Sequence, residues 1–184
     1  DAIKILHPEL ARITHLRARF EQSAHVANRF KHPGAVDIRD IFVTEDGCPF
    51  LVLPLLEGEC LSDIARRGPV PIDTVLSWTD QILDALSAAH AQGIIHRDIK
   101  LDNLFVTREG SLKVLDFGIA RVRDGAVSSA KTALGATLGT APYMPPEQVQ
   151  GREIDGRADL FAVGATMFRL IARRRIPDAG TEGE

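Results

Sequence analysis

The stretch His96-Arg97-Asp98-Ile99-Lys100-Leu101-Asp102-Asn103 decides the fold of this chain when it is taken together with Asp116-Phe117-Gly118. Two short runs of strand-forming residues, Leu104–Thr107 and Leu112–Leu115, lie between these motifs and are separated by a four-residue turn. This pattern predicts a β-hairpin. Because a hairpin brings its two open ends together, the side chains of Asn103 and Asp116 should converge there.

The residue types at this open end suit the binding of a phosphate group and a divalent cation. Asp98 and Lys100 stand just before Asn103, so a carboxylate, an ammonium group and two oxygen ligands should meet in one place. Oxygen ligands of this kind are the ones that Mg²⁺ binds. Each residue alone is explained as a solvated charge in a turn, but the whole set predicts a magnesium–phosphate site.

The two motifs, His-Arg-Asp followed by Asn and then Asp-Phe-Gly, resemble the catalytic and magnesium-binding loops of eukaryotic-type protein kinases. Lys100, two residues after Asp98, is similar to the serine/threonine branch of that family. Gly139-Thr140, ahead of Pro145-Pro146-Glu147, points the same way. By this resemblance the chain is identified as part of the catalytic domain of a bacterial, Hanks-type serine/threonine kinase.

The resemblance implies an α+β fold with two lobes. Residues 1–56 would form a partial small lobe with strands, one helix and the hinge. Residues 57–184 would form a partial, mostly helical large lobe with the catalytic loop, the activation segment and a central helix. The domain is expected to be truncated at both ends, because the family's glycine-rich loop would precede Lys4 and its last helices would follow Glu184.

The same resemblance implies transfer of the γ-phosphoryl group of ATP to serine or threonine hydroxyls of protein substrates. Asp98 would orient the acceptor hydroxyl and take its proton, and Lys100 would neutralise charge on the γ-phosphate. Asn103 and Asp116 would hold Mg²⁺. Lys4, in a strand at the start of the chain, would bind the α- and β-phosphates.

The adenine site is also implied by the resemblance. Leu53 would be the gatekeeper residue at the end of a strand. Pro54 would offer its backbone carbonyl to adenine and Leu56 its backbone N–H, and proline lacks only the N–H. Phe105, on the hairpin, would form the floor under the adenine ring.

One position departs from the family's pattern. The family's small-lobe helix carries a glutamate that pairs with the strand lysine, and its register, nine residues before His32, falls on Ser23. Glu21 is rotated from Ser23 by about 200° on a helix and is expected to pair with Arg17. The predicted inward stripe of this helix comprises Leu16, Phe20, Ala27 and Phe30. Ser23 should therefore face inward, which predicts that Lys4 lacks its usual partner.

Hydrophobic periodicity predicts helices over residues 8–30, 73–92 and 159–172, and strands over residues 36–43 and 50–53. Gly93 should end the second helix, because a left-handed residue that closes a helix is usually glycine. The third helix is apolar on most sides and should be buried. Asp159, at its start, matches by resemblance the residue that anchors the catalytic-loop backbone.

The composition limits the classes of function. The chain has 184 residues, of which 45% are hydrophobic and 26% charged, as in an ordinary globular domain. A net charge of −3 gives no reason to expect a nucleic-acid partner. The sequence offers neither a membrane span nor a signal peptide, so a cytoplasmic location without membrane contact is expected. Cys48 and Cys60 are predicted to be free thiols.

Two other functions are compatible with the same motifs. A pseudokinase would keep the fold and act as a binding or scaffold module, and Ser23 is its best support. One observation argues against a pseudokinase: the chain has all four of Asp98, Lys100, Asn103 and Asp116. A site that has lost its catalytic activity has no need to keep them. A small-molecule phosphotransferase is the third possibility, but the hydroxyl-rich segment around Gly139-Thr140 favours protein substrates.

Overall fold

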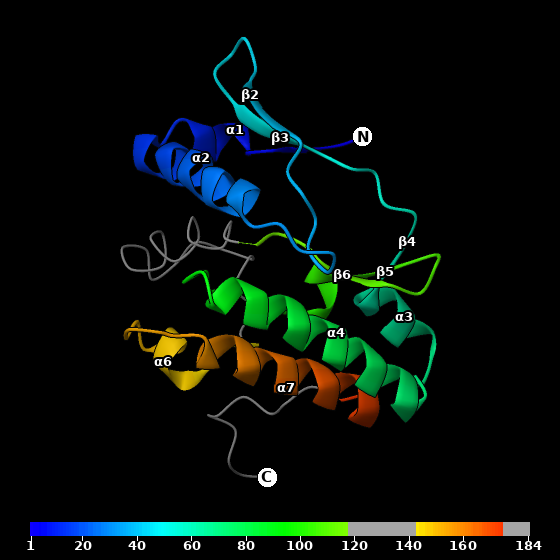
Figure 1. Ribbon diagram of the computed structural model, residues 1–184. Helices are drawn as coiled ribbons and strands as arrows, with labels where there is room; N and C mark the ends of the chain where they lie inside the picture. The colour runs from blue at the N-terminus through cyan, green and yellow to red at the C-terminus, as the bar shows by residue number, and fades with distance from the viewer. Residues whose placement is uncertain (118–142, 175–184) are drawn as a thin grey trace.

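The computed structural model describes residues 1–117 and 143–174, apart from the side chains of Arg19, Ser23 and Val26. A small part with a three-stranded sheet and two helices lies above a larger part with a second sheet and the longest helices (Figure 1). This α+β arrangement in two parts agrees with the predicted fold class.

The sheet of the small part has the strand order β1-β3-β2, formed by β1 (Ala2–Ile5), β3 (Pro49–Leu53) and β2 (Asp40–Val43). Both outer strands run antiparallel to β3, and Lys4 stands opposite Leu51. A separate hydrophobic core lies under this sheet. Its buried residues are Leu6, Leu16, Phe20, Ala24, Ala27, Ile38 and Leu51.

The helix predicted over residues 8–30 is two helices, α1 (Pro8–Ala11) and α2 (Thr14–Arg29). The break comes at Ile13, which leaves the helical conformation with φ −90° and ψ 102°. None of the residues of α1 is buried, whereas α2 packs its apolar stripe on the sheet. The change of direction at Ile13 lets α2 cover the sheet, because a continuous helix would keep the axis of α1. The prediction of one helix was therefore wrong, and the predicted stripe is confirmed.

The larger part is built on a sheet with the order β4-β5-β6. Its strands are β4 (Gly58–Cys60), β5 (Leu104–Thr107) and β6 (Leu112–Val114). The helices are α3 (Leu61–Arg67), α4 (Ile72–His90), the 3₁₀ turn η1 (Leu101–Asn103), α6 (Pro146–Val149) and α7 (Arg157–Ala172). The helices α4 and α7 lie side by side below the sheet (Figure 1). Gly93 has φ +73° just beyond α4, as predicted.

The loop after α2 ties the small part to the hairpin of the larger part. Ala35 forms a parallel bridge with Val114, whose N–H donates to the Gly34 carbonyl at 2.7 Å. Lys113 Nζ donates to the Pro33 carbonyl at 2.5 Å. The strand predicted over residues 36–43 begins only at Asp40, because the Val36 N–H donates to the Val114 carbonyl of β6 at 3.3 Å, whereas the Arg39 N–H already donates to the Val52 carbonyl of β3.

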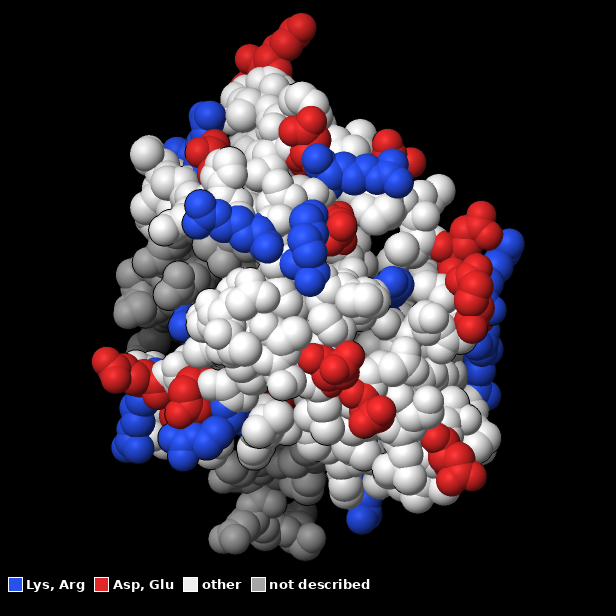
Figure 2. All heavy atoms as spheres, viewed as in Figure 1, with Lys and Arg blue, Asp and Glu red and all other residues white. Residues whose placement is uncertain are grey.

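Charged side chains of both signs are interspersed on the face shown in Figure 2. Many of them form ion pairs with a neighbouring side chain, such as Arg17 with Glu21 and Arg108 with Glu57. Among the described helices, none has both the length and the apolar character that crossing a membrane requires.

Candidate active site

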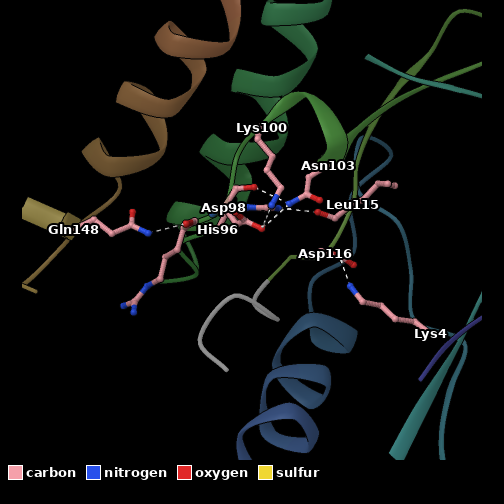
Figure 3. A network of polar contacts seen from close by, with 9 residues as sticks. Lys4, His96, Asp98, Lys100, Asn103, Leu115, Asp116 and Gln148 are labelled. Carbon is pink, nitrogen blue, oxygen red and sulfur yellow. Dashed lines mark hydrogen bonds and ion pairs between the residues drawn. The ribbon is translucent and has the colours of Figure 1, made fainter. Parts of the chain in front are cut away.

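The hairpin brings its two ends together as predicted (Figure 3). Leu104 stands opposite Val114, and one residue beyond each strand the Leu115 N–H donates to the Asn103 carbonyl at 2.9 Å. Asn103 therefore lies next to the residue that precedes Asp116. The two predicted metal ligands come from adjacent backbone positions at one end of the hairpin.

Asp98, Lys100 and Asn103 form one hydrogen-bonded group. Asp98 Oδ2 accepts from Asn103 Nδ2 at 2.9 Å and lies 3.0 Å from Lys100 Nζ. Asn103 Nδ2 also donates to the Asp98 backbone carbonyl at 2.7 Å. The side chains of Asp98 and Lys100 are only 12% and 11% exposed. Because Oδ2 has two donors, the direction of the carboxylate is fixed relative to the loop.

The backbone of this loop is held by a buried carboxylate from α7. Asp159 is completely buried, and its two oxygens accept from the N–H groups of His96 at 2.8 Å and Arg97 at 2.7 Å. The anchoring role that the resemblance implies for Asp159 matches this geometry. His90, at the end of α4, adds a third contact, with Nε2 2.8 Å from Asp159 Oδ2. A buried carboxylate needs such partners, because burying an unpaired charge is very costly.

His96 joins the catalytic loop to the hairpin. It is completely buried, and its Nε2 lies 2.7 Å from the Leu115 carbonyl. Its Nδ1 accepts from the Asp98 N–H at 3.2 Å. A carbonyl can only accept, so Nε2 carries the proton and the imidazole is the neutral Nε2–H tautomer. The ring packs edge-on against Phe117, with the ring centroids 4.9 Å apart.

The residue before the expected catalytic base and one of the two expected metal ligands have a left-handed backbone. Arg97 has φ +68° and Asp116 has φ +65°. Conformations of this kind cost about 1–3 kcal/mol for a residue other than glycine and persist where surrounding contacts hold them. At Arg97 the bond to Asp159 is one such contact. Of the three non-glycine residues with positive φ in residues 1–117 and 143–174, two thus lie at the expected reaction centre, and the third, Arg173, ends α7.

Lys4 has a partner that the sequence did not predict. Its Nζ lies 2.5 Å from Asp116 Oδ2, so β1 is joined to the end of the hairpin (Figure 3). Glu21 does not take part, because it pairs with Arg17 at 3.0 Å on the outer side of α2, as predicted. Whether Ser23 faces Lys4 is not tested, because the structure does not describe the Ser23 side chain. Lys4 itself is nevertheless paired.

A small cavity of about 80 Å³ lies between α2, the end of β3 and the hairpin. Its lining residues are Ala27, Val36, Ile38, Leu53, Leu115, Asp116 and Phe117. The predicted gatekeeper Leu53 and the predicted metal ligand Asp116 thus border the same space. The structure brings these residues together although they come from different parts of the chain.

The predicted adenine floor, Phe105, lies in β5 opposite Cys60 and Lys113. Gly58 passes so close to this strand that a Cβ would meet the Val106 carbonyl at 2.0 Å and the Phe105 ring at 2.8 Å. In the predicted hinge, Pro54 and Leu56 are half-buried, whereas Leu55 between them is 68% exposed. The segment from Leu53 to Leu56 leads directly from β3 into β4.

The arrangement at the hairpin fits a magnesium ion. The Asn103 amide nitrogen is turned to Asp98, which leaves its carbonyl oxygen as the atom for a cation. Asp116 uses one carboxylate oxygen for Lys4. Within residues 1–117 and 143–174 no three His, Cys, Asp or Glu side chains form a metal cluster. An amide and a carboxylate suffice for Mg²⁺, which usually keeps several waters and also binds substrate phosphates.

Cys60 lies in β4, next to this site. Burial raises the pKa of its thiol above the ordinary value of 9.0, and the nearby carboxylates of Asp63 and Asp102 raise it further. Its Sγ lies 3.7 Å from the Asp102 carbonyl. Cys60 is therefore a thiol at neutral pH, and both cysteines are free, as predicted.

Two residues of the site gave no signal in the sequence. His90 lies within the helix predicted over residues 73–92, and its bond to Asp159 spans 69 residues of chain. Gln148 follows the Pro-Pro-Glu motif, and its Nε2 donates to the Arg97 carbonyl at 3.0 Å. Gly139 and Thr140 lie outside the described residues.

Comparison with known proteins supports this interpretation of the fold. The family description "protein kinase domain" matches residues 2–183. The chain is 41% identical to the serine/threonine-protein kinase Pkn1 of Myxococcus xanthus over 177 residues, which are 94% of this chain and 25% of that protein. It is 34% identical to the serine/threonine-protein kinase PknB of Mycobacterium leprae over 174 residues, 92% of this chain and 28% of that protein.

The chain belongs to the protein kinase domain family. It spans about a quarter of the length of the curated relatives that it matches, and these are named as serine/threonine-protein kinases.

Proposed function

We propose that this chain contributes the catalytic centre of a serine/threonine kinase, which transfers the γ-phosphoryl group of ATP to hydroxyls of protein substrates. The observation that carries the proposal is the hydrogen-bonded group of Asp98, Lys100 and Asn103 beside the Lys4–Asp116 pair. Phosphoryl transfer needs positioned charge more than covalent chemistry. These residues supply positioned charges of both signs in one place.

Asp98 is the proposed base. Its carboxylate is oriented by Asn103 Nδ2 and Lys100 Nζ, so it can hold an acceptor hydroxyl and take its proton as the new O–P bond forms. Lys100 lies 3.0 Å from this carboxylate, which places its ammonium where it would neutralise charge on the transferred phosphoryl group. The proton goes from the hydroxyl to Asp98, and the leaving group is ADP.

Lys4 is the proposed ligand of the α- and β-phosphates, and Asn103 and Asp116 are the proposed ligands of Mg²⁺. Asn103 and Asp116 would hold the ion, which would supply positive charge that offsets the charge of the phosphates. Lys4 and Asp116 already lie at the same cleft, so a nucleotide phosphate and its cation would be received by neighbouring groups. We assign adenine to Leu53, the backbone of Pro54 and Leu56, and Phe105.

We further propose that residues 1–56 and 57–184 act as parts of the two lobes around this cleft. The division is supported by separate hydrophobic cores, although Phe30 and Ala35 pack in the larger one. Because the reaction consumes ATP, we place this segment in the cytoplasm. Its partners would be proteins with serine or threonine acceptors, rather than nucleic acids or lipid.

A pseudokinase is the second candidate, and one observation favours it. Asp116, the proposed metal ligand, is paired with Lys4, while the helix position that would normally occupy this lysine is Ser23. A chain that had lost catalysis would be expected to show such a self-paired site. The fixed orientation of the Asp98 carboxylate by Asn103 and Lys100 favours the active enzyme.

A transfer assay with the complete protein decides between these candidates. Radiolabelled ATP, Mg²⁺ and a generic basic acceptor protein are incubated with the wild type and with Asp98→Asn, and labelled residues are identified. We expect label on serine or threonine with the wild type only, and none without Mg²⁺. Nucleotide binding without any transfer by the wild type would favour the pseudokinase.

A further inference from the structure

The side chain of Gln148 reaches from α6 to the catalytic loop, as Figure 3 shows. Its Nε2 lies 3.0 Å from the Arg97 carbonyl, 51 residues earlier in the chain. A backbone carbonyl has no hydrogen to give, so the NH₂ end of the amide must face it. Gln148 is therefore a hydrogen-bond donor to the residue immediately before Asp98.

This bond completes the fixation of one peptide unit. The peptide between Arg97 and Asp98 has its carbonyl held by Gln148 at 3.0 Å and its N–H held by His96 Nδ1 at 3.2 Å. The flanking groups are held as well, the Arg97 N–H by Asp159 and the Asp98 carbonyl by Asn103. Two of these contacts come from the part of the chain after residues 118–142: Asp159 at the start of α7 holds the Arg97 N–H, and Gln148 in α6 holds the Arg97 carbonyl.

The fixation matters because Arg97 has φ +68°, a conformation that side chains of L-residues rarely adopt. If the carbonyl of Arg97 is released, φ and ψ of Arg97 can both change toward a more ordinary conformation, which turns the peptide that follows. Rotation changes φ of Asp98 and therefore the direction of its side chain. The carboxylate would then leave the position that Asn103 and Lys100 define.

The local structure presents Gln148 for this contact. Pro145 is buried with φ −70°, and Pro146 is the first residue of α6. The Gln148 N–H donates to the Pro145 carbonyl at 3.0 Å, so the backbone of Gln148 is tied to this proline pair. The side chain thus starts from a well-defined place and is itself half-buried.

We propose that Gln148 is a positioning residue for catalysis, which holds the Arg97–Asp98 peptide and so couples the segment after residue 142 to the base. This inference rests on the proposed kinase activity. Gln148 should affect the chemical step rather than nucleotide binding. The reason is that its side chain bonds to the Arg97 carbonyl and not to the proposed nucleotide ligand Lys4 or the proposed metal ligands.

The test compares Gln148→Met with Gln148→Glu in the complete protein. Methionine keeps the length of the side chain without a donor, and glutamate keeps its shape but directs an oxygen at the carbonyl. We expect kcat to fall about tenfold with methionine and further with glutamate, while KM for ATP stays within twofold. Gln150→Glu is the matched control, since Gln150 is exposed just beyond α6 and should leave both constants unchanged.

Hydrogen exchange of the catalytic-loop peptide over residues 95–103 gives a second measurement that does not need activity. Exchange should be faster in Gln148→Met than in the wild type and unchanged in Gln150→Glu. If the wild type transfers no phosphate, the proposed function fails but this measurement still tests the positioning. Unchanged exchange in Gln148→Met, or a fall in kcat matched by an equal rise in KM for ATP, would overturn the inference.

Discussion

Lys4 in β1 and Asp116 at the end of the hairpin form an ion pair, with Nζ 2.5 Å from Oδ2. The pair joins the two residues that we assign to nucleotide phosphates and to Mg²⁺. It also gives Lys4 a carboxylate from the hairpin rather than from α2, where Glu21 is turned outward to Arg17. The charge balance of the cleft is thus set by contacts between the two parts of the molecule.

Replacing Lys4 with methionine should weaken the binding of ATP-Mg²⁺ and leave the stability of the fold almost unchanged. The Lys4 and Asp116 side chains are 36% and 29% exposed, and pairs as exposed as this contribute about 0–1 kcal/mol. We therefore expect the free energy of unfolding in urea to change by less than about 1 kcal/mol, while calorimetric affinity for ATP-Mg²⁺ falls at least tenfold. Arg39→Met, at an exposed pair with Asp1, is the control and should leave affinity unchanged. An equal affinity in Lys4→Met would remove Lys4 from the site.

Ser23→Glu should raise the rate of phosphoryl transfer in the complete protein. Position 23 lies between Phe20 and Ala27, which are both buried against the small-part core, so a glutamate there would be placed toward the sheet that carries Lys4. It would compete with Asp116 for Lys4 and leave Asp116 for the cation. Steady-state kinetics would measure an increase in kcat of several-fold.

The controls for this experiment are Gln22→Glu and Glu21→Ala. Gln22 is exposed one residue away, and the Glu21 carboxylate is paired with Arg17. Neither substitution should change the rate. A rate that is unaffected by Ser23→Glu but lost with Glu21→Ala would show that the register assigned to this helix is wrong.

Asp159→Ala should destabilise the protein strongly. The change removes the acceptor of the His96 and Arg97 N–H groups and the partner of His90 in a completely buried place. Each buried donor left without a partner costs about 1–3 kcal/mol, so the two N–H groups alone should cost about 2–6 kcal/mol. Urea denaturation measures it. Glu153→Ala, six residues earlier and exposed, should have little effect; equal losses at the two positions would contradict the anchoring role.

Gly58→Ala should destabilise the second sheet, because the added Cβ would lie 2.0 Å from the Val106 carbonyl and the φ of +152° disfavours alanine. Overpacking of this kind costs about 1–3 kcal/mol. Gly68→Ala is the matched control, since nothing lies within 4 Å of its Cβ and its backbone is extended. Thermal unfolding of both variants checks the difference, and equal melting temperatures would refute the close approach of β4 and β5.

Cys60 should react slowly with iodoacetamide at neutral pH. Burial, and then the carboxylates of Asp63 and Asp102, hold its pKa above 9.0. Because the folded protein favours the protonated thiol, this contribution to stability is full below 9.0 and is lost as the pH rises through the folded pKa. A pH series of alkylation rates should give a midpoint above that of the urea-unfolded protein. Asp102→Asn should lower this midpoint, and a midpoint at or below the unfolded value would contradict the assignment.

The sequence by itself determined those features that depend on neighbouring residues. The hairpin between Asn103 and Asp116 follows from two strand runs and a turn, and the inward stripe of α2 follows from helical spacing. The motifs also sufficed to indicate the family, because Asp98, Lys100, Asn103 and Asp116 stand at characteristic separations. Such patterns are local, so one chain is enough to detect them.

The tertiary structure decided the partners that lie far apart in the chain. The break at Ile13 depends on how α2 packs on the sheet, and the late start of β2 depends on the bonds of Gly34 and Val36 to Val114. The pairing of Lys4 with Asp116 and the bond from Gln148 to Arg97 join residues that no spacing relates. The physical reason is that a charge or donor takes the partner that folding brings within about 3 Å, and packing of the whole chain selects that partner.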